Sequence, residues 1–250
     1  MSSIIYYIIF IILGLIIGSF LNVLIYRLPK NISIIKPSSF CPICNSKIKF
    51  YDNIPLISYI ILKGRCRSCK NKINIRYPIV EALTAFLYAL SYYFFKVSFN
   101  LLLALILITA LIVISFIDIE HGLIPNIIVL PLTLIGLLIN ILLMPKRWWI
   151  ILSFSFGAFL FMLIISLIYP KGMGMGDVKL SLMAGAFLVQ KIVPGLFIGF
   201  LAGSIFGLIM ILIKKRKLKQ TIPFGPFISF GCIIALFFGD KIINWYIGYL

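Results

Sequence analysis

Residues 101–117 read Leu-Leu-Leu-Ala-Leu-Ile-Leu-Ile-Thr-Ala-Leu-Ile-Val-Ile-Ser-Phe-Ile and carry no charge; the next residue is Asp118. An apolar run of this length is typical of a membrane-spanning helix. Similar runs lie at about 4–26, 78–95, 123–144, 150–169, 180–193, 195–213 and 224–247. The sequence therefore predicts an all-α polytopic membrane protein with about eight transmembrane helices.

The composition supports this class. The 250 residues are 62% hydrophobic, with a mean hydropathy of +1.17, which lies far outside the range of soluble domains. The net charge of +17 is interpreted as cytoplasmic loops rich in Lys and Arg rather than as a nucleic-acid surface. The first run has no basic residues before it and no small-residue cleavage site after it, so we expect a retained helix rather than a removed signal peptide.

Residues 27–77 form the one long polar connection, with eleven Lys or Arg, four cysteines and a single acid. The positive-inside rule assigns this segment to the cytoplasm. Alternating crossings then put both termini outside, and Lys171, Lys179 and the basic run 214–219 inside. The predicted domains are the first transmembrane helix (1–26), a cytoplasmic four-cysteine domain (27–77) and a membrane-embedded domain (78–250).

Two of the six acidic residues stand at the ends of apolar runs. Asp118 closes the third run, and Asp177 follows Gly-Met-Gly-Met-Gly (172–176) just before the sixth. Two crossings lie between them, so both carboxylates are predicted near the cytoplasmic face. Two carboxylates that share a site share one proton, and such a pair hydrolyses amides without a metal or a covalent intermediate. The alternative is that each aspartate caps a helix N-terminus.

Other polar residues near these runs have several interpretations. Asp118, Glu120 and His121 together could bind a divalent cation, although His121 is the only histidine and the spacing offers no two-histidine helix face. Glu81 could be a helix-start charge, a partner of Arg76 or a cleft-lining group. Lys179 could steady the Asp177 carboxylate or face the lipid headgroups.

Two Cys-x-x-Cys pairs lie in the polar segment: Cys41 with Cys44, and Cys66 with Cys69. Four thiolates at this spacing are typical of a tetrahedral zinc site, and four sulfurs leave no position for an activated water, so the zinc is predicted to be structural. Two disulfides are the alternative, which a reducing cytoplasm disfavours. Cys232, in the last apolar run, is interpreted as a packing residue.

Several stretches together match one known family, and they run through nearly the whole chain. They are Gly-Ser-Phe-Leu-Asn-Val-Leu-Ile-Tyr-Arg-Leu-Pro (18–29), Tyr-Asp-Asn-Ile-Pro-Leu-Ile-Ser-Tyr (51–59), Gly-Arg-Cys-Arg-Ser-Cys (64–69), Arg-Tyr-Pro-Ile-Val-Glu (76–81), Ile-Pro-Asn (124–126), Gly-Met-Gly-Asp-Val-Lys-Leu (174–180) and Pro-Phe-Gly-Pro-Phe (223–227). With these motifs the chain resembles the prepilin leader peptidases, membrane aspartic proteases of the GxGD type.

The resemblance implies that Asp118 and Asp177 are the catalytic pair. It also implies a bacterial inner-membrane enzyme that cleaves the short basic leader of type IV pilin-like precursors, after a glycine, at the cytoplasmic face. The full cysteine domain is similar to that of the bifunctional form, which implies N-methylation of the new N-terminus with S-adenosylmethionine. Glu120 and Glu81 are candidates for binding the basic leader.

Two other functions remain open on the residues alone. A transporter or proton channel also places carboxylates in membrane helices, and a non-catalytic assembly partner could dock through the cysteine domain. The precursor and the oligomeric state are not determined by the sequence.

Overall fold

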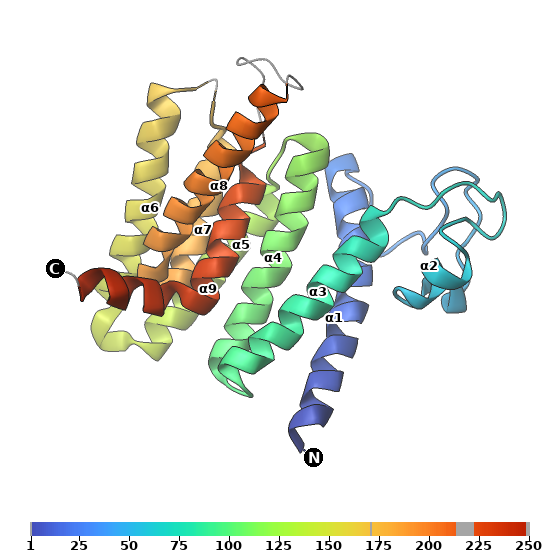
Figure 1. Ribbon diagram of the computed structural model, residues 1–250, viewed down its shortest axis with the longest axis horizontal. Helices are drawn as coiled ribbons and strands as arrows, with labels where there is room; N and C mark the ends of the chain where they lie inside the picture. The colour runs from blue at the N-terminus through green and yellow to red at the C-terminus, as the bar shows by residue number, and fades with distance from the viewer. Residues whose placement is uncertain (1, 171, 214–222, 249–250) are drawn as a thin grey trace. The chain divides into compact units, whose positions relative to one another are not determined.

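The computed structural model describes residues 2–170, 172–213 and 223–248 and is built from helices (Figure 1). Within these ranges there is no β-strand, only isolated bridges between Phe40 and Lys47 and between Arg65 and Lys72. The predicted all-α class is therefore confirmed. Lys171 and the basic run 214–219, predicted to be cytoplasmic, lie outside the described residues.

The long helices match the eight predicted runs. They are α1 (Ser2–Arg27), α3 (Arg76–Phe95), α4 (Phe99–His121), α5 (Asn126–Leu143), α6 (Trp148–Ile168), α7 (Met175–Leu188), α8 (Ile192–Leu212) and α9 (Gly225–Ile247). Seven stretches of the described residues are long and apolar enough to cross a membrane, because Met175–Leu212, which contains α7 and α8, counts as one. With fourteen residues, α7 is about 21 Å long, shorter than the apolar core of a bilayer.

Most helix boundaries differ from the predicted ones by a few residues, and two of these differences concern the aspartates. Helix α4 continues past Asp118 and ends at His121, where Gly122 adopts a φ of 64° that suits a helix C-terminus. Helix α7 begins at Met175, before the predicted start at 180, because Gly174 is its N-cap. Asp118 therefore lies in the last turn of α4 and Asp177 in the first turn of α7, rather than in the connections.

The chain divides into two compact units, Met1–Val113 and Ile114–Leu250. In the first unit α1 packs along α3. A Cβ atom on Gly18 would lie 2.7 Å from the Cα atom of Glu81, so the two backbones approach closely where α1 has glycine. The Asn22 amide also donates to the carbonyl of Tyr77 at 3.1 Å. The small and polar residues of α1 thus serve helix packing.

Between α1 and α3 the chain forms short helical turns and loops: η1 (Leu28–Lys30), η2 (Phe50–Asn53) and α2 (Ile57–Ile61). The guanidinium of Arg67 binds both carboxylate oxygens of Asp52, with a shortest distance of 2.6 Å. This ion pair ties η2 to the second Cys-x-x-Cys segment.

In the second unit α7 is the buried element. Ten of its fourteen residues are buried, and it packs against α5, α6 and α9, while α8 packs mainly on α9 (Figure 1). A Cβ atom on Gly185 would lie 2.8 Å from the Cα atom of Ser155, which shows how closely α6 approaches. The Asn140 amide of α5 donates at 2.8 Å to the carbonyl of Ala186, in the last turn of α7. The last turn of α7 is therefore held by a polar contact from α5.

Candidate active site

Asp118 is buried, with 6% of its surface exposed, and its Oδ2 accepts a hydrogen bond of 2.9 Å from the backbone N–H of Gly225. Gly225 is the first residue of α9. The N-terminal N–H groups of a helix carry partial positive charge, so this contact favours a negative charge on Asp118. A Cβ atom on residue 225 would lie 2.7 Å from the same oxygen. The position therefore requires glycine.

Asp177 is equally buried, with 6% exposed. Its Oδ2 accepts a hydrogen bond of 3.2 Å from the backbone N–H of Gly174, which is half of a capping box; glycine has no side chain to supply the other half. The other oxygen, Oδ1, is buried and has no hydrogen-bond partner in the described part of the chain. An unpaired buried carboxylate oxygen is costly and marks a place where a ligand or a proton is needed.

The carboxyl groups of Asp118 and Asp177 interact electrostatically with each other. They come from α4 and α7, so the two helix ends predicted to share a face do lie together within the second unit. Each carboxylate also accepts a bond from a backbone N–H at a helix start, from Gly225 in α9 and from Gly174 before α7, but neither aspartate is the N-cap of the helix that follows it.

Ile124 packs against the backbone at the start of α7 and at the start of α9. A Cβ atom would lie 2.9 Å from the Cβ atom of Ile124 if placed on Gly176, and 3.3 Å from its Cδ1 atom if placed on Gly225. Two glycines from distant segments thus allow the starts of α7 and α9 to close around one side chain. This contact brings the segments Ile-Pro-Asn, Gly-Met-Gly-Asp and Pro-Phe-Gly-Pro together.

The other charged candidates do not join the pair. Glu120 and His121 are partly exposed and lie 4.0 Å from each other, and within the described residues they form no metal-ligand cluster with Asp118. The ammonium of Lys179 donates at 3.1 Å to the side-chain oxygen of Asn126, which links α7 to the start of α5. Glu81 is buried in the first unit, where its Oε2 accepts from the N–H of Leu56 at 2.9 Å.

The four predicted cysteine ligands come together. The sulfur atoms of Cys41, Cys44, Cys66 and Cys69 all lie within 4.8 Å of one another, and those of Cys41 and Cys69 are 3.9 Å apart. Zn–S bonds of about 2.3 Å in a tetrahedron put sulfur atoms about 3.8 Å apart. The donor set and its spacing therefore fit a structural zinc ion.

The two cysteine pairs have the same local fold. In the first, the N–H of Asn45 donates to the carbonyl of Cys41 at 2.9 Å; in the second, the N–H of Lys70 donates to the carbonyl of Cys66 at 3.0 Å. Asn45 and Lys70 both have positive φ, at 56° and 60°. These turns bring both thiols of a pair to one side.

One thiol in this cluster is already poised to ionise. A hydrogen bond with the side chain of Ser46 lowers the pKa of Cys44 to about 6, and the Sγ–Oγ distance is 3.0 Å. Since thiolates rather than thiols bind metal, this contact favours metal binding at neutral pH.

Sequence reasoning assigned no role to Gly225, the residue that contacts Asp118. The available signal was the motif Pro-Phe-Gly-Pro-Phe (223–227), in which the glycine stands between two Pro-Phe pairs directly before an apolar run. Prolines at such positions fix a helix start, and a glycine there suggests that another group approaches the backbone closely.

Two family models match the chain. Residues 12–95 match the bacterial peptidase A24 N-terminal domain, and residues 105–212 match the type IV leader peptidase family. A protein of Legionella pneumophila is 38% identical over 94% of this chain and 92% of its own. The chain belongs to the type IV leader peptidase family. Other members of that family include proteins of Bacillus subtilis, 36% identical over 94% of this chain and 96% of its own, and of Pseudomonas aeruginosa, 34% identical over 95% and 92%.

All three relatives are named prepilin leader peptidase/N-methyltransferase. This member of the leader peptidase family has no significant match among solved structures.

Proposed function

We propose that this protein cleaves the leader peptide from type IV pilin-like precursors, with Asp118 and Asp177 as the catalytic pair, and methylates the new N-terminus. Membership of the type IV leader peptidase family and the names of the relatives support the reaction class. The observation that carries the assignment of residues is that two buried carboxyl groups lie near enough to interact electrostatically, and that one of them has an unpartnered oxygen within the described residues.

The mechanism follows from a shared proton. One aspartate is charged and takes a proton from a water molecule, whose oxygen attacks the scissile carbonyl carbon; the neutral aspartate donates its proton to the carbonyl oxygen. The tetrahedral intermediate then collapses: the C–N bond breaks as the leaving nitrogen takes a proton from the neutral aspartate, and one hydroxyl of the intermediate gives its proton to the charged aspartate, which restores a pair with one shared proton. The N–H of Gly225 stabilises Asp118 whenever that carboxylate bears the charge.

The cleavage site is proposed to lie near the cytoplasmic face of the bacterial inner membrane. The basic residues of 27–77 and the parity of the crossings support this side. A precursor whose apolar segment is itself a membrane helix presents its leader junction at that interface, close to the helix ends that carry Asp118 and Asp177.

Zinc is proposed as a structural cofactor held by the four cysteines. A segment of about fifty residues with short helices and few buried side chains needs such a cross-link for stability. The zinc takes no part in cleavage.

S-adenosylmethionine is proposed as the methyl donor, on the strength of the relatives' names. When bound it supplies an electrophilic methyl group: the neutral N-terminal amine forms the N–C bond while the C–S bond breaks, a neutral thioether leaves, and the amine loses one proton.

The proposal is tested by cleavage of a purified pilin-like precursor in liposomes. Asp118→Asn and Asp177→Asn keep the side-chain size and remove the charge, and each is expected to lower the rate by more than about a thousandfold. Asp240→Asn is the matched control, because Asp240 is exposed and pairs with Lys191 at 2.6 Å. Wild-type rates in either active-site variant would refute the aspartate pair. Loss of an ion flux instead of cleavage would point to a transporter.

A further inference from the structure

A short apolar run lies between the two Cys-x-x-Cys pairs. Residues 54–62 read Ile-Pro-Leu-Ile-Ser-Tyr-Ile-Ile-Leu and carry no charge, and they are too few to cross a bilayer. Three isoleucines of α2 are exposed: Ile57 by 54%, Ile60 by 73% and Ile61 by 67%; Phe50 of η2 is 86% exposed. Large apolar side chains gathered on one short segment mark a place that another apolar phase covers.

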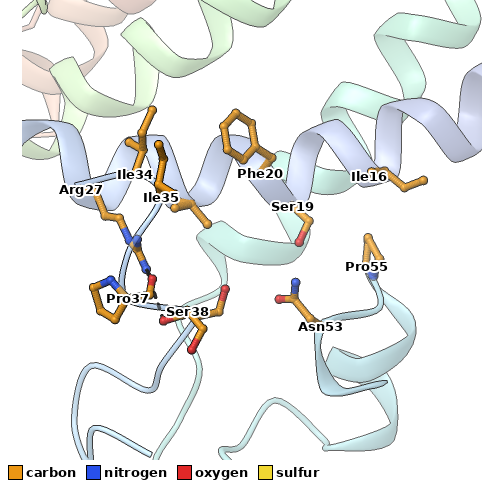
Figure 2. A pocket seen from close by; sticks show the side chains of 12 residues that line it. Ile16, Ser19, Phe20, Arg27, Ile34, Ile35, Pro37, Ser38, Asn53 and Pro55 are labelled. Atoms are coloured by element: carbon orange, nitrogen blue, oxygen red, sulfur yellow. Dashed lines mark hydrogen bonds between the residues drawn. The ribbon is translucent and has the colours of Figure 1, made fainter. Parts of the chain in front are cut away.

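This run is fixed to the side of α1 and not beyond its end. The N–H of Leu56 donates to the Glu81 carboxylate of α3 at 2.9 Å, and the same carboxylate hydrogen-bonds the hydroxyl of Ser19 on α1. Figure 2 shows Asn53, the last residue of η2, opposite Ser19 across a hollow of about 390 Å³. The start of the run therefore lies at the level of Ser19.

The level of Ser19 is inside the membrane. Arg27 is the last residue of α1 and Lys30 follows it, so these cations are predicted to mark the cytoplasmic end of the first span. Ser19 stands eight residues before Arg27, which is about 12 Å along the helix axis. The acyl chains of one leaflet occupy about 15 Å. A run attached at this level meets acyl chains rather than water.

The backbone of the run suits an apolar surrounding, where each polar group needs a partner within the protein. The N–H groups of Ser58, Ile60 and Leu62 donate to the carbonyls four residues earlier, at 2.9–3.1 Å. The N–H of Leu56 precedes the first turn of α2, and it is bonded by the Glu81 carboxylate instead. This contact satisfies a donor that the short helix leaves free.

Cations border the run on both sides. Lys49 precedes it, Lys63 and Arg65 follow it, and all three are exposed. Asp52 is the one acid of residues 27–77, and its carboxylate is neutralised by the ion pair with Arg67 at 2.6 Å. The charge around the run is therefore complementary to anionic phospholipid headgroups. Long basic side chains reach such headgroups while the neighbouring apolar residues lie deeper.

We infer that the segment 50–61 dips into the cytoplasmic leaflet of the membrane. Ile57, Ile60 and Ile61 lie among the acyl chains, and Lys49 and Lys63 lie at the headgroups. The chain enters and leaves the leaflet on one side, so the parity of the crossings is unchanged. The segment predicted to be cytoplasmic is thus anchored to the lipid at its centre, with a four-cysteine turn on each side of the anchor.

The apolar helix of a precursor, or a second copy of this chain, could also cover these isoleucines. Lipid is the occupant that the position favours, because acyl chains surround α1 at this level whether or not a partner is bound. The flanking cations agree with this choice, since they fit phosphate groups and would repel both a basic leader and the same basic segment of a second copy.

Tryptophan fluorescence in nanodiscs of phosphatidylethanolamine and phosphatidylglycerol tests the inference, with one full-length protein per disc. Ile60→Trp and, separately, Ile57→Trp introduce a single reporter after the natural tryptophans are replaced by phenylalanine, at Trp148, Trp149 and Trp245. Phospholipids brominated on their acyl chains should lower the emission of both reporters at least about twofold, and aqueous acrylamide should quench them weakly.

Ile43→Trp in the same background is the matched control. Ile43 lies inside the first Cys-x-x-Cys pair and is 59% exposed, close to the value for Ile57. Its reporter should be quenched by acrylamide and not by the brominated lipid. Zinc content and cleavage of a precursor verify that each variant is folded.

Three results would overturn the inference. If acrylamide quenched the reporters at positions 57 and 60 as strongly as the one at position 43, the segment would lie in water. Protection from acrylamide that appears only when precursor is added would assign the isoleucines to the substrate. Protection that appears only in discs with two copies of the protein would assign them to a dimer.

Discussion

Gly225 donates its backbone N–H to the Oδ2 atom of Asp118 at 2.9 Å, across more than a hundred residues of chain. The contact joins the last turn of α4 to the first residue of α9. It makes the start of α9 part of the candidate active site, although no side chain of that segment takes part.

Replacing Gly225 by alanine should therefore damage catalysis more than folding. The new Cβ atom would lie 2.7 Å from Asp118 Oδ2, so the carboxylate must move, and a displacement of this kind lowers rates by about a hundredfold. Steady-state cleavage of a precursor measures the loss. Gly157→Ala in α6 is the control, because a Cβ atom there has nothing within 4 Å. Equal rates in the two variants would show that the close approach has no catalytic role.

Removing the Asn140 amide should loosen the far end of α7. The amide is buried and donates to the carbonyls of Ala186 and Gly136, and Asn140→Ala leaves the carbonyl of Ala186 with one partner fewer. We expect a loss of about 1–2 kcal/mol in the free energy of unfolding, seen as a lower melting temperature in detergent. A melting temperature equal to that of the wild type would mean that the bond adds nothing net.

Lys70→Gly should stabilise the cysteine domain. Lys70 has a φ of 60°, which costs a residue with a Cβ atom about 1 kcal/mol and costs glycine almost nothing. The midpoint temperature of zinc release to a chelator should rise. Lys72→Gly is the matched control, since Lys72 lies in a bridge with Arg65 and gains only flexibility. A lower midpoint for Lys70→Gly would contradict the strain at this turn.

Leu56 has a φ of 58°, which is strained for a residue with a side chain. Glu81→Ala should free this turn, whereas Glu81→Gln should largely keep it. The glutamine oxygen can still accept the bond of 2.9 Å from the Leu56 N–H; alanine has no acceptor. Hydrogen exchange of the Leu56 amide, measured by mass spectrometry of the full-length protein, should accelerate at least about tenfold in the alanine variant alone. Unchanged protection in that variant would show that the Glu81 carboxylate does not hold the turn at Leu56.

The sequence predicted the helical class and the clustering of the four cysteines well, because long apolar runs and Cys-x-x-Cys spacing are local signals. The common face of Asp118 and Asp177 was also predicted, since the number of crossings between them is even. The sequence did not predict contacts that depend on the absence of a Cβ atom or on tertiary packing. Gly225 donates its backbone N–H to Asp118 and has no side chain that would block this contact. Arg27, at the end of α1, is buried by loops whose path depends on tertiary packing.

Other features depend on competing local conformations or on distant contacts, which no short sequence pattern predicts. The helix boundary at Met175 follows from Gly174 acting as an N-cap, although glycine also fits a loop at that position. The hydrogen bond from Leu56 to Glu81 and the ion pair between Asp52 and Arg67 join segments that lie apart in the chain. The predicted three-domain division and the catalytic roles remain predictions.

Helix α7 is short and enclosed by its neighbours, which frees it from matching the thickness of the bilayer. The helices around it meet the acyl chains and adjust to them by tilting, while the Asp177 carboxylate keeps its distance from the Asp118 carboxylate. An enzyme built in this way should cleave at similar rates in membranes of short and long lipids, as long as the precursor itself can reach the pair.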